Sequence, residues 1–225
     1  MAAMPRAFYI TGTDTGIGKT HASLALIHAL RAGGWRVAGM KPVASGCEVT
    51  ADGLRNEDAL ALQAAGDPLP AYGLVNPVAL LAATAPEIAA ARQRFGFELA
   101  HLLAAFERLR EGRDALVVEG VGGWLAPLSA NLMQADLVRA LRLPAVLVVG
   151  LRLGCINHAL LTLRALRADG VSVAGWIGNA IDPAFDFAAE TRAILRQRLD
   201  APCLGMLEHG VAPTQATLDL SALGV

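Results

Sequence analysis

Six short apolar runs, spaced along the whole chain, constrain the fold more than any other feature of the sequence. Each run is continuous and rich in β-branched residues, and none alternates regularly between apolar and polar positions. Strands of this kind are buried on both faces, as in a parallel sheet covered by helices. The expected strands are residues 7–12, 36–42, 115–120, 145–150, 171–179 and 202–207.

Longer segments with helical patterns lie between these runs. Repeated strand–helix order predicts the α/β class, with a mostly parallel sheet flanked by helices in three layers. We expect one domain over residues 1–225, because no segment has the composition of a linker. The Pro-, Ala- and Gly-rich stretch 66–96 is the least regular, and it is either an active-site cover or a long surface connection. Helices are expected near residues 19–32, 56–65, 97–111, 131–141, 154–169 and 185–199.

The composition argues against several functional classes. The formal net charge is −1, which is not typical of a surface for nucleic acid or an anionic membrane. No uncharged apolar run reaches about 18 residues, the length of a membrane-spanning helix. Residues 1–12 are too short and strand-like for a signal peptide. The three cysteines have neither disulfide nor zinc spacing. We expect a cytoplasmic protein with no nucleic-acid or membrane partner.

The segment after the first strand has the chemistry of a phosphate-binding loop but an unusual spacing. In the common pattern G-x-x-x-x-G-K-[ST], Thr13 occupies the place of the first glycine, and Gly12 comes one residue too early. Glycines before the helix let backbone N–H groups converge on an anion, and the helix start adds partial positive charge. Lys19 supplies a full charge for the phosphates, and the Thr20 hydroxyl suits Mg²⁺. The alternative is a glycine-rich turn with a solvated lysine.

Three further side chains suit the same site. Lys41 follows the second strand, where open α/β sheets bind ligands, although a lone lysine is otherwise a solvated surface charge. Asp58 stands early in a helix, where a carboxylate also stabilises the helix start. Glu119 ends a strand before a glycine-rich turn, as Mg²⁺-binding carboxylates do in P-loop enzymes. A strand-end glutamate without this function is the alternative. With Thr20, the two carboxylates form a set of hard oxygen ligands.

Together these motifs resemble the dethiobiotin synthetase family over nearly the whole chain. In the family's order they read "GTDTGIGKT", "KPVASG", "GLRNEDALAL", "VEGVGGWLAPL", "LPAVLVVGLRLGCINHALLT" and "VAGWIGN". The family's phosphate loop has the same one-residue offset. The resemblance implies a P-loop NTPase-like fold and an ATP-dependent reaction of biotin biosynthesis. In that reaction 7,8-diaminononanoate and CO₂ give dethiobiotin through a carbamate and a carbamic–phosphoric anhydride, with release of ADP and phosphate.

The resemblance also implies roles for individual residues and an assembly. Lys19 and Lys41 would be catalytic, and Mg²⁺ would be held by Thr20, Asp58 and Glu119. The chain would form a homodimer, in which the segment 153–157 serves the neighbouring subunit's substrate site. The diamine would contact Thr15, Lys41, Ser45, Gly122, Leu153, Gly154, Cys155 and Asn157. ATP would contact Thr15, Gly16, Ile17, Gly18, Lys19, Thr20, Asp58, Glu119, Gly120, Val121, Gly122, Asn179, Ala180, Glu208, His209 and Gly210.

Three positions depart from the family pattern, and three other functions compete with it. Many members have Glu where this chain has Gly16, Asp where it has Ala180, and Pro near Glu208. A partition- or positioning-type P-loop ATPase usually carries a second lysine early in the loop and a basic tail, and this chain has neither. A glutamine-dependent amide synthetase of the same superfamily needs a glutaminase domain, for which the chain has no room. A catalytically degenerate nucleotide-binding paralogue is the third alternative.

Overall fold

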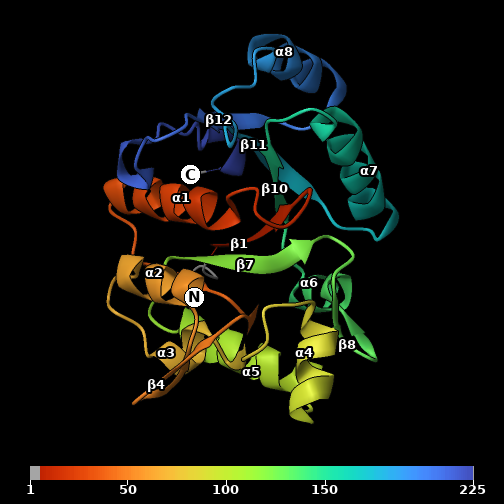
Figure 1. Cartoon of the computed structure of the whole chain (residues 1–225). Helices are drawn as coiled ribbons and strands as arrows, with labels where there is room; N and C mark the ends of the chain where they lie inside the picture. The colour runs from red at the N-terminus through yellow and green to blue at the C-terminus, as the bar shows by residue number, and fades with distance from the viewer. Residues whose placement is uncertain (1–5, 225) are drawn as a thin grey trace.

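A six-stranded parallel sheet forms the centre of the computed structural model, which describes residues 6–224 (Figure 1). The strand order is β12-β11-β10-β1-β7-β2, and every neighbouring pair is parallel. The six expected strands are confirmed, and with them the α/β class. Their bounds are β1 Arg6–Gly12, β2 Val37–Met40, β7 Ala115–Gly123, β10 Ala145–Gly150, β11 Val173–Asn179 and β12 Cys203–Leu207.

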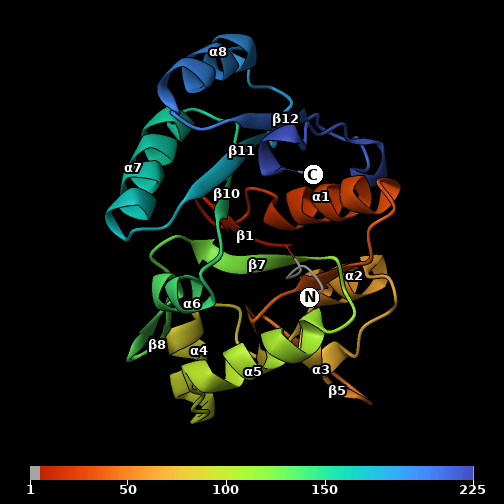
Figure 2. The ribbon, with the colours of Figure 1, turned by 180° about the vertical axis from the view of Figure 1, so that it is seen from behind.

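Neighbouring residues of one strand pack against helices on opposite faces of the sheet. Ile10 of β1 packs with α1 (Lys19–Ala32) and α2 (Glu57–Ala65). Tyr9 packs with α5 (Leu99–Arg110) and α6 (Gln134–Leu141). Helices α7 (Cys155–Ala168) and α8 (Ala188–Arg198) share a further apolar cluster with β10 and β11. Figures 1 and 2 show α1 and α2 on one side of the sheet and α6 and α7 on the other, as expected for three layers.

All six expected helices are present, and the starts of two of them were predicted too early. The helix expected at 131–141 begins only at Gln134, because β9 (Leu132–Met133) pairs antiparallel with β8 (Pro127–Ser129). The helix expected at 185–199 begins at Ala188. None of the helices described between residues 6 and 224 is long and apolar enough to cross a membrane.

The stretch 66–96 contains more regular structure than its composition predicted. It includes α3 (Tyr72–Val75), β6 (Val78–Leu80) and α4 (Pro86–Gln93). Strand β6 pairs in parallel with β3 (Val43–Ser45), and a hairpin of β4 (Glu48–Thr50) and β5 (Gly53–Arg55) lies nearby in the chain. Strands β3 and β6 and helix α4 share an apolar cluster with α5 and α6, so tertiary packing stabilises these three elements where local propensity is weak.

The order of the strands creates a crevice beside β1. After β1 the chain builds β2 on one side of the sheet, and later it adds β10, β11 and β12 on the other side. Open α/β sheets bind ligands at such a switch point, outside the carboxyl ends of the strands. The phosphate loop follows β1 there, and Lys41 follows β2. The expectation that Glu119 ends its strand was wrong, because β7 continues to Gly123. Glu119 lies in the middle of β7 opposite Ile10 of β1, where the register between the two strands shifts.

Candidate active site

The turn between β1 and α1 presents backbone N–H groups to an open space. Gly16 and Gly18 have φ angles of 71° and 80°, which is the left-handed region that favours glycine. Gly18 is the N-cap of α1 and makes no side-chain cap hydrogen bond. The first N–H groups of a helix have no partner within the helix. Together with the partial positive charge of the helix start, they make this turn suitable for phosphate.

Lys19 is the first residue of α1, directly after this loop, and is buried. Its side-chain ammonium donates to the backbone carbonyl of Asp14 over 2.9 Å. Burial lowers the pKa of Lys19 to about 8, and the neighbouring ammonium of Lys41 acts in the same direction. Burial disfavours the charged form of Lys19. A triphosphate in the loop would place negative charge beside the ammonium and stabilise that form.

A second lysine joins the phosphate loop to two carboxylates. Nζ of Lys41 lies 2.5 Å from Oε1 of Glu119 and 2.7 Å from Oδ2 of Asp58. The Thr20 hydroxyl donates to the same glutamate oxygen over 2.9 Å. Asn56 caps α2 by accepting from the N–H of Ala59, and this cap orients the helix start that carries Asp58. Residues from α1, α2, β7 and the connection after β2 therefore converge on one cluster.

The charges of this cluster hold each other in their ionised forms. Burial by itself lowers the pKa of Lys41, but Glu119 and Asp58 outweigh it and raise the net pKa above the ordinary lysine value. Burial likewise raises the pKa of Asp58, but Lys41 outweighs it, and the net pKa is lowered. Lys41 is thus a fixed cation at neutral pH.

One carboxylate oxygen of this cluster is left without a partner among the residues that the structure describes. Glu119 is fully buried, and its Oε2 has no hydrogen-bond partner within residues 6–224. A buried carboxylate oxygen without a partner is costly, so a ligand at this place would satisfy it. No group of three His, Cys, Asp or Glu side chains that could hold a metal occurs in the described part of the chain. An ion here would take the hydroxyl of Thr20, the two carboxylates and oxygens of a bound nucleotide.

One cavity opens onto this cluster, and a second cavity adjoins the first. The cavity in front of the phosphate loop measures about 410 Å³. The next measures about 520 Å³ and includes the start of α4, with Ala83 to Pro86. Both are lined by Thr15, Ser45, Val121 and Gly122. Of the predicted site residues, the first cavity collects Thr15, Gly16, Gly18, Lys19, Thr20, Lys41, Ser45, Asp58, Glu119, Val121 and Gly122.

Two residues predicted to contact ATP face the protein interior. Ile17 packs its side chain into the core. A Cβ on Gly120 would lie 2.7 Å from the Tyr9 hydroxyl and 2.6 Å from Gln134 Oε1. The glycine is therefore required for packing behind the cavity. Asn56 and residues 83–86 line the cavities but were not among the predicted site residues. A signal for 83–86 was the irregular character of the stretch 66–96, which the sequence left open as an active-site cover.

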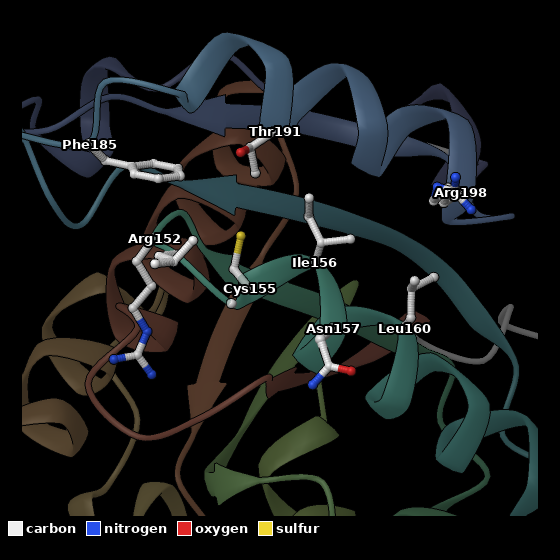
Figure 3. Close-up of a pocket in the computed structure, with 10 residues that line it drawn as sticks. Arg152, Cys155, Ile156, Asn157, Leu160, Phe185, Thr191 and Arg198 are labelled. Carbon is white, nitrogen blue, oxygen red and sulfur yellow. The ribbon is translucent and has the colours of Figure 1, made fainter.

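The predicted substrate segment 153–157 lies at a third cavity of about 490 Å³, which shares no lining residue with the first two. Figure 3 shows this cavity between the start of α7 and α8. Leu153, with 91% of its surface exposed, is open to solvent, whereas Cys155 is buried. Arg152, just before this segment, reaches the phosphate loop through an ion pair with Asp14.

The predicted base-binding residues lie at the ends of β11 and β12, which are paired strands: Asn179 is the last residue of β11, and the others follow the two strands. Asn179 is buried, and its side-chain amide donates to the carbonyl of Ile17 over 2.9 Å. The N–H of Ala180 bonds to Leu207, which places Glu208, His209 and Gly210 next to the end of β11. None of these five predicted residues lines the cavity of the phosphate loop. The Glu208 carboxylate is paired with Arg192 over 2.9 Å.

Comparison with solved structures shows the class of protein. A cell division protein FtsY from Thermotoga maritima has a TM-score of 0.51 at 19% identity, over 97% of this chain and 66% of that chain. A signal recognition particle receptor FtsY from Elizabethkingia anophelis, in complex with GDP, has a TM-score of 0.54 at 14% identity, over 99% of this chain and 62% of that chain. This chain spans about two thirds of their length, and the likeness shows the fold alone. Residues 6–214 also match the family described as an AAA domain. Fold and phosphate loop define a P-loop NTPase-like protein.

Curated relatives narrow this class to a family. A protein of Xanthomonas oryzae pv. oryzae (strain PXO99A), named ATP-dependent dethiobiotin synthetase BioD, is 61% identical over 90% of this chain and 91% of its own length. A protein of the same name from Xylella fastidiosa (strain M12) is 57% identical over 97% of this chain and 98% of its own length. The chain belongs to the ATP-dependent dethiobiotin synthetase family of ligases, as its motifs predicted.

Proposed function

We propose that this chain closes the ureido ring of dethiobiotin from 7,8-diaminononanoate, CO₂ and ATP, releasing ADP and phosphate. One structural observation supports the proposal in addition to family membership. The phosphate-loop cavity and its neighbour share Thr15 and Ser45, and the two lysines and two carboxylates converge in the first of them. A nucleotide in the first cavity and a diamine in the second would therefore meet beside Lys41.

The proposed chemistry requires stabilisation of charge more than a nucleophilic side chain. One amine of the substrate adds to CO₂ and loses a proton, which gives a carbamate. A carbamate oxygen then attacks the γ-phosphorus, ADP leaves, and a carbamic–phosphoric anhydride remains. The second amine attacks the anhydride carbonyl, loses a proton and expels phosphate. Lys19 and Lys41 would neutralise charge on the phosphate and carbamate oxygens, an effect that is strong when the donors are already in place.

A magnesium ion completes the proposed site. Thr20, Asp58 and Glu119 would hold it, and the bound ion would screen the negative charge of the β- and γ-phosphates. The protein contributes the fixed positions of these oxygens, because three different elements carry them. Asn179 would have two roles. Its side-chain amide bonds to the phosphate loop and would hold the loop in place, and the residue would also lie next to the nucleotide base. Ala180, Glu208, His209 and Gly210 would form the rest of the base site.

We also propose a homodimer in which the segment 153–157 binds the substrate carboxylate of the neighbouring subunit. Two observations support this arrangement: the exposed Leu153, and a cavity that shares no wall with the two at the phosphate loop. A cytoplasmic location agrees with the use of ATP, and one domain over residues 1–225 stays a prediction. Light scattering should give twice the monomer mass for the wild type, and Leu153→Asp should shift the population toward monomer.

The decisive experiment supplies diamine, bicarbonate, Mg²⁺ and ATP, and follows dethiobiotin by mass spectrometry and phosphate by colorimetry. We expect product and phosphate in equal amounts, and neither when diamine is omitted. Phosphate release without diamine would favour a free-standing ATPase. Absence of turnover with intact nucleotide binding would indicate a degenerate paralogue.

The phosphate cradle has its own test. Lys19→Gln should bind ATP more weakly in a calorimetric titration, because a full positive charge leaves the loop. An unchanged dissociation constant would exclude Lys19 from the cradle.

A further inference from the structure

Arg152, which was not among the predicted site residues, lines the third cavity and is also bonded to the phosphate loop. Arg152 lies two residues after β10, in the turn before α7. Its Nη2 is 2.6 Å from Oδ2 of Asp14, which is 138 positions earlier in the sequence. In Figure 3 the Arg152 side chain points away from Cys155 and α8, toward the loop that has the colour of the N-terminal part.

Asp14 connects this arginine to the residues that face the phosphates. Its second carboxylate oxygen, Oδ1, accepts the N–H of Thr15 over 2.8 Å. Its backbone carbonyl accepts the ammonium of Lys19 over 2.9 Å. Thr15 and Lys19 both line the cavity of the phosphate loop. Any movement of Asp14 would therefore be transmitted to both residues.

Asp14 also carries a negative charge beside an anion-binding loop. An unpaired carboxylate there would repel a nucleotide phosphate, since like charges disfavour each other at short range. Arg152 cancels that charge and holds the carboxylate in one orientation. The two side chains are 43% and 48% exposed, and exposed ion pairs contribute little to the stability of a fold. Stability alone therefore gives no reason for this contact.

We propose that Arg152 is a positioning residue for ATP, which acts through Asp14 by masking its charge and fixing the phosphate loop. The proposal rests on the proposed function only in placing nucleotide phosphates in this loop. It concerns binding of the nucleotide and does not involve the diamine or the ring closure.

Calorimetric titration of the full chain with ADP and Mg²⁺ tests this role. We expect Arg152→Met to weaken binding about tenfold, and Arg152→Lys to stay within about threefold of the wild type because the charge is kept. Asp14→Asn combined with Arg152→Met should bind more tightly than Arg152→Met alone, because no unmasked charge remains. The control is Arg139→Met. This variant breaks the ion pair between Arg139 and Asp136 on α6, which has the same 2.6 Å length as the Arg152–Asp14 pair. It should leave the affinity for ADP unchanged.

Salt distinguishes the electrostatic role from a merely structural one. The Debye length falls from about 10 Å at 0.1 M salt to about 3 Å at 1 M. The difference between Arg152→Met and the wild type should therefore shrink over that range. Wild-type affinity in Arg152→Met would overturn the proposal. A loss of affinity that persists in Arg152→Lys, and that adding Asp14→Asn to Arg152→Met does not reduce, would also overturn it. If the wild type makes dethiobiotin while Arg152→Met binds ADP normally, the inference fails and the proposed function stands. If no dethiobiotin forms but Arg152→Met loses ADP affinity as expected, the inference stands without that function.

Discussion

Replacing Lys41 by methionine should destabilise the protein strongly in the absence of ATP and Mg²⁺. Methionine keeps an apolar stem of similar length, so the change removes mainly the ammonium. The ammonium lies between Glu119, which is fully buried, and Asp58, whose side chain is 41% exposed. Without it, two carboxylates face each other, and the one from Glu119 has no water to solvate it.

The magnitude follows from the cost of an uncompensated buried charge. Removing one partner of a buried ion pair costs about 3–5 kcal/mol. The upper end of this range is limited, because a carboxylate that has lost its partner can take up a proton and so lose its charge. For a glutamate side chain with the reference pKa of about 4.3, that uptake costs roughly 3.7 kcal/mol at pH 7. We therefore expect a loss of about 3–4 kcal/mol, or roughly 6–16 °C in Tm for a chain of this size.

The pH dependence has a defined sign. Protonation becomes easier as the pH falls, so the penalty should decrease to about 1.6 kcal/mol near pH 5.5. Urea unfolding followed by circular dichroism at both pH values measures the loss. Arg139→Met is the matched control. Its ion pair with Asp136 spans three positions on an exposed helix face, and such pairs contribute about 0.3–0.5 kcal/mol. A loss for Lys41→Met no larger than the control, or a loss independent of pH, would refute the reasoning.

Magnesium should reverse part of this loss. A ligand that binds only the native state stabilises it by about 2.7 kcal/mol at 100 times its dissociation constant. In the wild type, Lys41 occupies oxygens of both carboxylates, so Mg²⁺ alone must compete with it. Lys41→Met should therefore gain more Tm from added Mg²⁺ than the wild type does. No gain in the variant would show that Glu119 and Asp58 do not hold the ion.

ATP binding should take up protons near pH 8, because the pKa of Lys19 is about 8 in the free protein and bound phosphate raises it; the affinity then falls as the pH rises above that value. Calorimetry in buffers of different ionisation enthalpy measures the uptake, and its absence would contradict the assignment. Gly16→Ala should weaken nucleotide binding only modestly, because the positive φ of 71° strains an alanine there but no atom lies within 4 Å of an added Cβ. Gly18→Ala should lose it, because the new Cβ would overlap the side-chain amide of Asn179. Equal dissociation constants for these two variants would argue against this geometry. Lys41→Gln should lower kcat at least about 100-fold, and wild-type turnover would remove Lys41 from the mechanism.

Part of the site was predictable because strand ends can be recognised locally. Lys41 and Glu119 stand at or near the ends of apolar runs, and β2 and β7 are neighbours in the sheet. Their meeting at one edge follows from parallel pairing. Strand pairing alone did not predict that Lys41 bridges Glu119 and Asp58, because Asp58 comes from a helix whose orientation depends on packing. The Asp14–Arg152 pair was missed because nothing in either local segment indicates the other.

The sequence by itself determined the parallel sheet, the helix order and the phosphate loop. These depend on patterns within a few residues, such as continuous apolar strands and glycines before a helix start. Only the tertiary structure decided that residues 83–86 line a cavity, that Asn179 holds the loop at Ile17, and that Arg152 reaches Asp14. Such contacts join segments far apart in the chain. They depend on strand order and on the packing of whole elements, which no local pattern of residues encodes.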